Sequence, residues 1–368
     1  MIYCVIFTTL FALAFISQKK DNEFKEKAFK YSVIFMTIFS ALRYYVGHDW
    51  ESYYNIHSSS SWHLSDHDFI EPGFTLVSKF CFAILHNYES SFQLLTIIFT
   101  VTTMLLYYYI INKYSRNKIF SLALLFPMYF LNTVFGQIRY GLVLAICLFS
   151  IEYIKDKKFM KFLAIMTVAF LFHFSALFFI PIYFIVNINF SKIFKVIILI
   201  LSTLFGVIIN PIKLLEVLND KFINSNYLSS KLSLYSNSDS SIFSSSFIYI
   251  VIIFIFIYIV YKKQSIRDEN MKLMLNMMFW GIVFYIATNR FEIVAFRASS
   301  YIFIIEIILI PNIISVMEDK YKIIKNIFVF FVVLYSLYRL YITVFYWIDV
   351  FIPYRSFISY IISSLFLR

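Results

Sequence analysis

The sequence predicts an all-α polytopic integral membrane protein with about 11–14 transmembrane or re-entrant helices. Of its 368 residues, 61% are hydrophobic and only 14% are charged. A water-soluble domain cannot bury that much apolar surface. Apolar runs of spanning or near-spanning length recur from end to end, with no internal repeat and no separate soluble domain. We therefore expect residues 1–368 to form a single multi-pass membrane domain.

Lysine placement predicts the topology, because cytoplasmic loops of membrane proteins are rich in basic residues. Six lysine-rich breaks interrupt the apolar sequence, at 18–30, 113–118, 155–161, 188–195, 262–272 and 318–325. We place all six in the cytoplasm, with the first helix retained and its N-terminus outside. This bias accounts for the net charge of +11 without a nucleic acid partner.

Three segments are not expected to cross the membrane as single spans in this topology. Residues 162–187 have lysines at both ends and legs of about 12 residues, too short to span alone, so we expect a hairpin with His173 near its apex. A single crossing would instead put the basic break at 262–272 outside. Residues 72–86 are expected to re-enter, which makes 47–90 one outward unit. The polar stretch 211–245 is expected to be an outward flexible loop, either a tether or a lid.

Arginine is distributed differently from lysine. Charges at membrane depth are costly and usually face a cavity or a partner, and the planar guanidinium binds phosphate oxygens in pairs. The pattern therefore suggests an anionic, phosphate-bearing ligand; the alternative is local pairing, as between Arg290 and Glu292, or snorkelling. Six arginines lie in, or at the outer end of, apolar segments: Arg43, Arg139, Arg290, Arg297, Arg339 and Arg355.

The stretch ALRYYVGHDWESYY at 41–54 supplies one half of such a site. Arg43 ends an apolar run, Gly47 permits a sharp exit, and Asp49 and Glu51 follow. Glu71 then precedes a Pro-Gly pair where the chain re-enters. Carboxylates beside an arginine are suitable for activating a hydroxyl next to a phosphate leaving group.

Metal and cofactor sites are not expected. The loop HLSDHDF offers His63, Asp66, His67 and Asp68, but its spacing is typical of a solvated surface rather than a metal site. The three cysteines are scattered in apolar segments and indicate neither disulfides nor metal ligands. No glycine-rich loop indicates a nucleotide site.

Five motifs in order resemble the EpsG-like family of Wzy-type polysaccharide polymerases: RYYVGHDWESYY at 43–54, EPGF at 71–74, GQIRYGLVLA at 136–145, FHFSALFFIP at 172–181 and RASSYIF at 297–303. They cover roughly residues 30–310. The resemblance implies a fold akin to C-type membrane glycosyltransferases. It also implies glycosyl transfer at the outer face of a bacterial cytoplasmic membrane, without a cofactor or nucleotide sugar. The product would be an O-antigen, capsule or exopolysaccharide.

In that reaction a glycan moves from undecaprenyl pyrophosphate to the non-reducing end of another lipid-linked repeat unit, and a chain-length regulator protein is a candidate partner. Carried over by residue, the resemblance implies these roles. The candidate bases are Asp49 and Glu71, with His173 third. The candidate pyrophosphate- or glycan-binding residues are Arg43, Arg139, Arg297, Tyr53, Tyr301 and Ser175.

Two points qualify these roles. Arg43 either joins the pyrophosphate site or holds Asp49 or Glu71 in place. His48 and Trp50 flank the aspartate where the family more usually has an acidic-aromatic pair, so we do not assign Trp50 as a sugar platform.

Three other functions compete with polymerisation. A flippase for lipid-linked oligosaccharide would share the helices and arginines, but would more often show two similar halves and charges near mid-membrane. A membrane acyltransferase would need a histidine with acidic neighbours, and the sequence places none beside His173. A structural scaffold would not need outward arginines.

Overall fold

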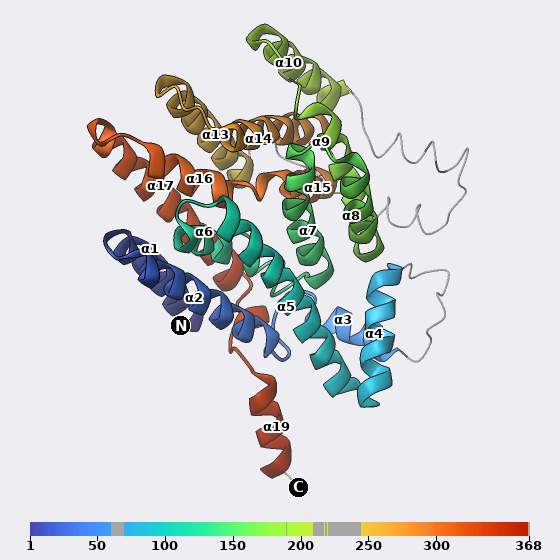
Figure 1. Cartoon of the computed structure of the whole chain (residues 1–368). Coiled ribbons are helices and arrows are strands. Elements are labelled where there is room, and N and C mark those ends of the chain that lie inside the picture. Colours follow the sequence, from blue (N-terminus) through green and yellow to red (C-terminus); the bar gives the residue numbers. More distant parts are fainter. Residues whose placement is uncertain are drawn as a thin grey trace.

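Long apolar runs fold into helices, and the computed structural model of the chain is built from them (Figure 1). It describes residues 1–59, 70–188, 190–208, 217, 219, 244–290 and 292–366, and these contain no β-strand. The predicted loop 211–245 lies almost wholly outside them. Five segments are long and apolar enough to span a membrane: Ile2–Lys19, Tyr88–Tyr114, Ser245–Lys263, Glu269–Thr288 and Asp319–Phe345. The chain is therefore an all-α polytopic membrane protein, as predicted.

The first half of the chain contains α1 (Ile2–Ile16), η1 (Ser17–Lys19), α2 (Asn22–Ala41), α3 (Trp50–Ser58), α4 (Pro72–Leu85), α5 (Tyr88–Tyr114), α6 (Lys118–Leu125), η2 (Phe126–Phe130), α7 (Ile138–Lys155), α8 (Phe159–Phe172), η3 (Phe174–Phe179) and α9 (Ile180–Ile185). The second half contains α10 (Lys192–Ile208), α13 (Ser245–Lys263), α14 (Glu269–Thr288), α15 (Glu292–Phe303), α16 (Glu306–Val316), η5 (Asp319–Tyr321), α17 (Lys322–Leu340), η6 (Tyr341–Phe345), α18 (Ile348–Phe351) and α19 (Phe357–Phe366).

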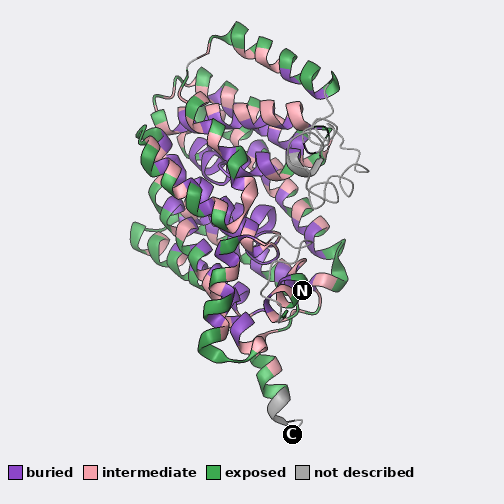
Figure 2. Cartoon of the chain, turned by 90° about the vertical axis from the view of Figure 1, so that its right-hand side faces the viewer, coloured by how far each residue is buried: buried purple, intermediate pink, exposed green. Residues whose placement is uncertain are grey.

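Burial follows the arrangement expected of a helix bundle in lipid. Helices α6 and α7 are buried along most of their length and form the centre. Helices such as α10 and α17 expose large aliphatic and aromatic side chains. Exposed residues are frequent on the outer helices of the bundle, and buried residues fill its centre (Figure 2). An apolar exterior of this kind would be unfavourable in water and is stable against hydrocarbon.

The segment after α7 forms the predicted hairpin. His173 adopts an extended conformation between α8 and η3, which ends the first leg. The ring of Tyr183, near the end of the second leg, lies 5.1 Å from that of Phe159 and 4.9 Å from that of Phe162, at the start of the first. The two legs are therefore antiparallel, with His173 at the apex.

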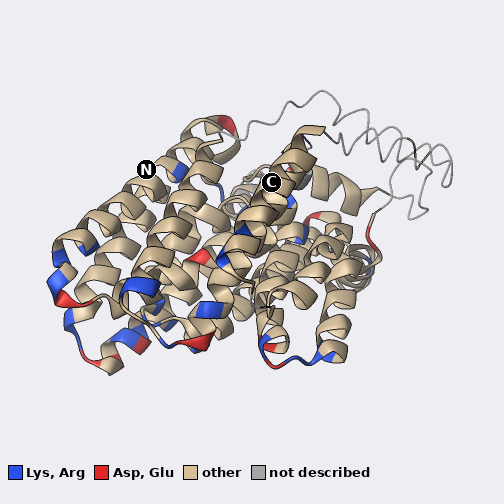
Figure 3. Cartoon of the chain, turned by 90° about the horizontal axis from the view of Figure 1, so that it is seen from above, with Lys and Arg blue, Asp and Glu red and all other residues tan. Residues whose placement is uncertain are grey.

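Ion pairs join several lysine-rich breaks on one face of the bundle. Lys118 pairs with Glu26, Lys113 with Glu152 at 2.6 Å, and Arg116 with Asp268 at 3.1 Å. Figure 3 shows many of the charged residues gathered along one edge of the molecule. The shared face agrees with the common side that we assigned to these breaks. Its orientation toward the cytoplasm stays a prediction.

The C-terminal segment is held against the loop after α2. The backbone N–H of Tyr44 donates to Arg355 O at 2.9 Å, and that of Phe357 donates to Leu42 O at 2.8 Å. Further along the loop, the N–H of Gly47 donates to Val350 O at 3.1 Å. These bonds bring the segment after α17 to the residues around Asp49.

Gly47→Ala should destabilise this contact. Gly47 has φ of +111°, and an added Cβ would lie 2.6 Å from Phe135 O, too close for any side chain. We expect a loss of about 1–3 kcal/mol, measured as a lower thermal midpoint of the purified protein in detergent. Asn55→Ala, on the exposed side of α3, is the matched control and should leave the midpoint unchanged. An unchanged midpoint for Gly47→Ala would contradict the proposed constraint.

Candidate functional site

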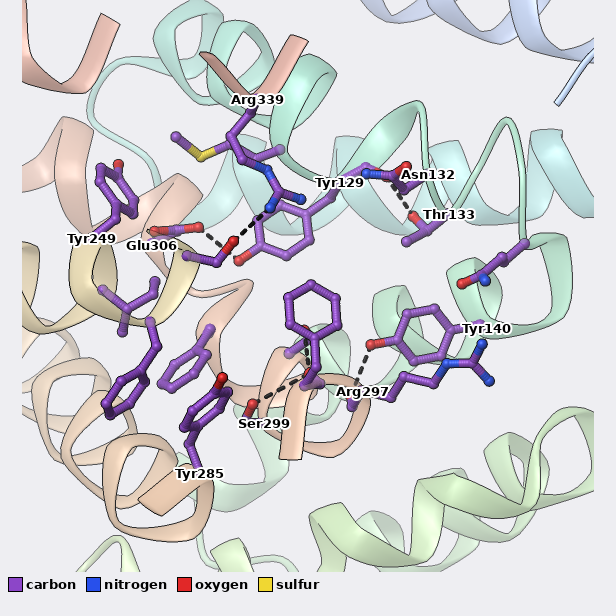
Figure 4. Close-up of a pocket in the computed structure, with 18 of the residues that line it drawn as sticks. Tyr129, Asn132, Thr133, Tyr140, Tyr249, Tyr285, Arg297, Ser299, Glu306 and Arg339 are labelled. Atoms are coloured by element: carbon purple, nitrogen blue, oxygen red, sulfur yellow. Dashed lines mark hydrogen bonds between the residues drawn. The ribbon is translucent and has the colours of Figure 1, made fainter. Parts of the chain in front are cut away.

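A cavity of about 430 Å³ lies among η2, α13, α15, α17 and the loop before α3 (Figure 4). Its size falls in the ~300–1,000 Å³ range of small-molecule sites. Its lining is rich in aromatic rings, hydroxyls and amides. These include Tyr129, Asn132, Thr133, Gln137, Tyr140, Tyr249, Tyr285, Ser299, Ser300, Tyr335 and Trp347.

Four charged residues line this cavity: Asp49, Arg297, Glu306 and Arg339. Asp49 is the residue before α3, and its side chain makes no hydrogen bond or ion pair with the described residues. Arg297 and Arg339 likewise form no ion pair within the described part of the chain, although Arg339 Nη1 donates to Ser246 Oγ at 2.7 Å. Two cations and two carboxyl groups thus remain available to a ligand.

A second group of charges surrounds Glu71, the residue before α4. One oxygen, Oε2, pairs with Arg139 Nη1 at the start of α7. The other, Oε1, lies 2.6 Å from His173 Nδ1 at the hairpin apex. Burial raises the pKa of Glu71, but its hydrogen bond with His173 and the positive charge of Arg139 outweigh this and leave the pKa below its ordinary value.

The two hydrogen bonds that Glu71 accepts decide what this group can do. With both oxygens engaged, Glu71 has little capacity to take a proton from a substrate. It orients the imidazole instead, as a carboxylate does in a carboxylate–histidine pair. His173 Nε2 makes no hydrogen bond with the described residues, so it is the atom in this group that can exchange a proton.

Arg139 packs against two aromatic rings. Its guanidinium lies 5.1 Å from the ring centre of Tyr53 and 5.3 Å from that of Phe74. These cation–π contacts and the Glu71 pair hold it rigidly. Asp49 lies within electrostatic reach of Arg139, so the two groups of charges influence one another.

Tyr140 separates the two groups. Its ring lines the cavity on one side and lies 6.0 Å, edge to face, from that of His173 on the other. Its hydroxyl donates to Arg297 O at 2.8 Å. Nearby, the hydroxyls of Ser175 and Tyr301 share a hydrogen bond of 2.6 Å, and Tyr301 is buried beside Tyr140.

The structure therefore divides the predicted site residues into two neighbouring groups. Asp49 and Arg297 line the cavity, while Glu71, Arg139, His173 and Tyr53 form the second group behind Tyr140. The hydroxyls of Ser175 and Tyr301 are hydrogen-bonded to each other next to Tyr140.

Arg43 belongs to neither group. It is buried, its Nη1 donates to Ser40 O at 2.6 Å, and its guanidinium lies 5.1 Å from the Phe135 ring. It contacts neither Asp49 nor Glu71, the two residues that we considered as its partners. Its backbone forms a bridge with Ser356, in the C-terminal segment.

Some expectations fall on residues outside this description. The loop with His63, Asp66, His67 and Asp68 is not among the described residues, nor is the side chain of Glu292, the expected partner of Arg290. Within the described ranges, no group of three histidine, cysteine or acidic side chains could hold a metal ion.

Sequence reasoning left several cavity residues out of the site. Glu306 is a lone acid in the apolar run IIEIILIP, and an ionisable residue at membrane depth is itself a sign of function. Arg339 was recognised among the six arginines but given no role. Tyr129, Tyr249 and Trp347 carry no such signal, because tyrosine and phenylalanine are abundant throughout this chain.

The histidine with an acidic neighbour that an acyltransferase would need is present in the fold. The sequence places no acidic residue beside His173, but the fold brings Glu71 Oε1 to 2.6 Å from its Nδ1. Residues 102 positions apart in the chain make this pair, so local sequence could not show it.

The arrangement defines a membrane protein with an interior polar cavity and a neighbouring buried carboxylate–histidine–arginine group. The EpsG family model matches residues 26–356, nearly the whole chain and beyond the 30–310 covered by the motifs. The chain belongs to the EpsG family, and is a membrane protein related to polysaccharide synthesis. Comparisons with curated proteins and with solved structures give no match.

Glu71→Gln should destabilise the protein and change how its stability depends on pH. Removing the charge leaves Arg139 buried without a counter-ion, at a cost of about 3–5 kcal/mol. Because the pKa of Glu71 is lowered by folding, its contribution is present at neutral pH and is lost as pH falls below ~4.

Thermal unfolding of the wild type and Glu71→Gln, measured from pH 7 to 2, tests this. The two midpoints should differ widely at pH 7 and converge on acidification. Glu318→Gln, which removes an exposed carboxylate paired with Lys320, is the control. A constant difference across this range would contradict the ionised pair.

Proposed function

We propose that the protein is a polysaccharide polymerase. It transfers a glycan from undecaprenyl pyrophosphate to the non-reducing end of another lipid-linked repeat unit, at the outer face of a bacterial cytoplasmic membrane. The observation that carries this proposal is the cavity. Asp49 and Arg297 both line it and form no ion pair with the described residues, and both are expected from the family resemblance. EpsG-family membership supports the polysaccharide chemistry.

The chemistry follows from these two residues. The acceptor hydroxyl attacks the anomeric carbon of the donor sugar, forming a new C–O bond while the bond to the pyrophosphate oxygen breaks. Asp49 takes the hydroxyl proton, and Arg297 stabilises the negative charge that develops on the departing pyrophosphate. No nucleotide sugar, metal or other cofactor enters the step.

The group around Glu71 supports this reaction. Because Glu71 already neutralises Arg139, we assign Arg139 a positioning role rather than direct contact with pyrophosphate. Through Glu71 it fixes His173 against Tyr140, the residue that also holds the backbone of Arg297. His173 Nε2 is the second candidate base, and Arg43 acts only in the fold.

A flippase for lipid-linked oligosaccharide is the second candidate function. The buried acid Glu306 favours it, because transporters often carry ionisable groups within the membrane. The two functions differ in what reaches the cell surface, and so one experiment separates them.

Deletion of the gene tests the proposal through the length distribution of surface glycan. A polymerase deletion should remove long chains while single repeat units are still displayed outside, and the restored gene should return them. If no repeat unit reaches the surface and lipid-linked units accumulate inside, the protein is a flippase and the catalytic assignments fail. If a chain-length regulator is a partner, removing that regulator should change the modal length of the surface glycan without abolishing polymer.

Asp49→Asn and Arg297→Ala should each lower polymerisation by about 10²–10³-fold, since one removes the base and the other the cation at the leaving group. The measurement is polymer formed from lipid-linked repeat units by the purified protein in lipid nanodiscs. Glu51→Gln and Arg290→Ala change exposed charges near the same segments and serve as controls. Full-length polymer from either cavity variant would contradict its role.

A further inference from the structure

The end of the cavity away from Arg297 has its own polar residues. Figure 4 shows Glu306, Arg339, Tyr129 and Tyr249 together at one end, and Tyr140 and Arg297 at the other. None of the first four has a role in the proposed reaction. They come from η2, α13, α16 and α17, so the fold assembles this end from both halves of the chain.

Two buried polar atoms at this end lack partners. Glu306 is 3% exposed; Tyr129 OH donates to its Oε1 at 2.7 Å, while Oε2 has no hydrogen-bond partner among the described residues. The hydroxyl of Tyr249 is also without one. A buried carboxyl oxygen left unpaired costs about 1–3 kcal/mol or more, so its presence beside a cavity indicates a group that a ligand satisfies.

The mixture of charges limits what that ligand can be. Glu306 accepts hydrogen bonds and would repel an anion, whereas Arg339 only donates them and would repel a cation. The two are not ion-paired, so both keep free hydrogen-bonding capacity. Hydroxyl groups, which donate and accept at once, suit this pair, and several neighbouring hydroxyls on one neutral molecule suit it best.

An aromatic surface completes the site. Trp347 lines the cavity and is 50% exposed, and its indole lies 5.3 Å from the ring of His48, the residue before Asp49. Its position depends on η6, a π-helix of Tyr341–Phe345 that separates Arg339 from Trp347. A second π-helix, η2, carries Tyr129, and Asn132 Nδ2 just beyond it donates to Thr343 Oγ1 at 3.2 Å. Single-turn π-helices are rare and occur often at functional sites.

We propose that Glu306, Tyr249, Arg339 and Trp347 form a carbohydrate-binding subsite. Glu306 Oε2 accepts a hydrogen bond from a sugar hydroxyl, Tyr249 and Arg339 bind neighbouring hydroxyls, and the indole of Trp347, beside His48, packs on the face of a further sugar ring. The inference rests on the proposed function, since it assigns this end of the cavity to neutral sugars of the repeat unit while Arg297 binds pyrophosphate.

Binding of carrier-free sugar tests the subsite apart from catalysis. The probe is the repeat-unit oligosaccharide, cut from the host's own polymer and free of lipid and phosphate, titrated calorimetrically into the full chain in nanodiscs. We expect Glu306→Gln to weaken binding about tenfold. Trp347→Ala should weaken it about threefold to tenfold, while Trp347→Phe should retain most of it. Tyr249→Phe should give a smaller loss.

The controls are chosen to separate a local effect from a general one. Phe330→Ala removes an aromatic ring on α17 that is 69% exposed and does not line the cavity, and should bind as the wild type does. If Glu306→Gln does not fold, the half-exposed Trp347 pair decides the question. Wild-type affinity in both Glu306→Gln and Trp347→Ala, or no binding by the wild type, would overturn the subsite.

The outcome also distinguishes the two proposals. If the wild type binds the oligosaccharide but forms no polymer from lipid-linked repeat units, the proposed function fails and the subsite stands. If the wild type polymerises while the subsite variants bind normally, the subsite fails and the polymerase stands.

Discussion

The carboxylate of Glu71 is the contact on which the arrangement of this protein depends. It joins the start of α4 to the start of α7, 68 residues away, and to the hairpin apex, 102 residues away. Each partner is polar or charged at a place surrounded by apolar helices. Leaving any of them unpaired there would cost several kcal/mol. The pairing therefore selects one way of packing these three elements, and Tyr140, one residue after Arg139, is placed between the group and the cavity as a result.

A second constraint closes the cavity from the other side. The backbone bonds between residues 42–47 and the C-terminal segment carry α17, η6 and Trp347 to the loop that holds Asp49. Buried Arg43 lies at this junction: its backbone forms a bridge with Ser356, and its side chain binds Ser40 O and packs on Phe135. An arginine that looks like a ligand residue in the sequence thus acts by fixing the elements that do line the cavity.

Much of the architecture could be predicted because the length and charge of each segment determine how that segment lies in a membrane. Apolar run length predicted the helical membrane fold, lysine placement predicted the common face, and two short legs between lysines predicted the hairpin at His173. The site was less accessible. Arg297 was predicted from a positive charge at unusual depth and Asp49 from its place at the membrane surface after Arg43, both together with family motifs, but the partners of Glu71 depend on packing between distant segments. The unpaired hydrogen-bonding atoms of Glu306 and Tyr249 depend on how distant segments pack, and no sequence pattern encodes that.

The distribution of paired and unpaired charges explains why the two groups can have different roles. Around Glu71 every charge is matched, both carboxyl oxygens are used and Arg139 packs against two aromatic rings. Such a group is rigid and gives position rather than binding. In the cavity, Asp49, Arg297, Glu306 and Arg339 make no ion pairs with the described residues. These four side chains can therefore bind complementary groups of a ligand, and in the proposed reaction a sugar linked to a pyrophosphate offers hydroxyls to one end and an anion to the other.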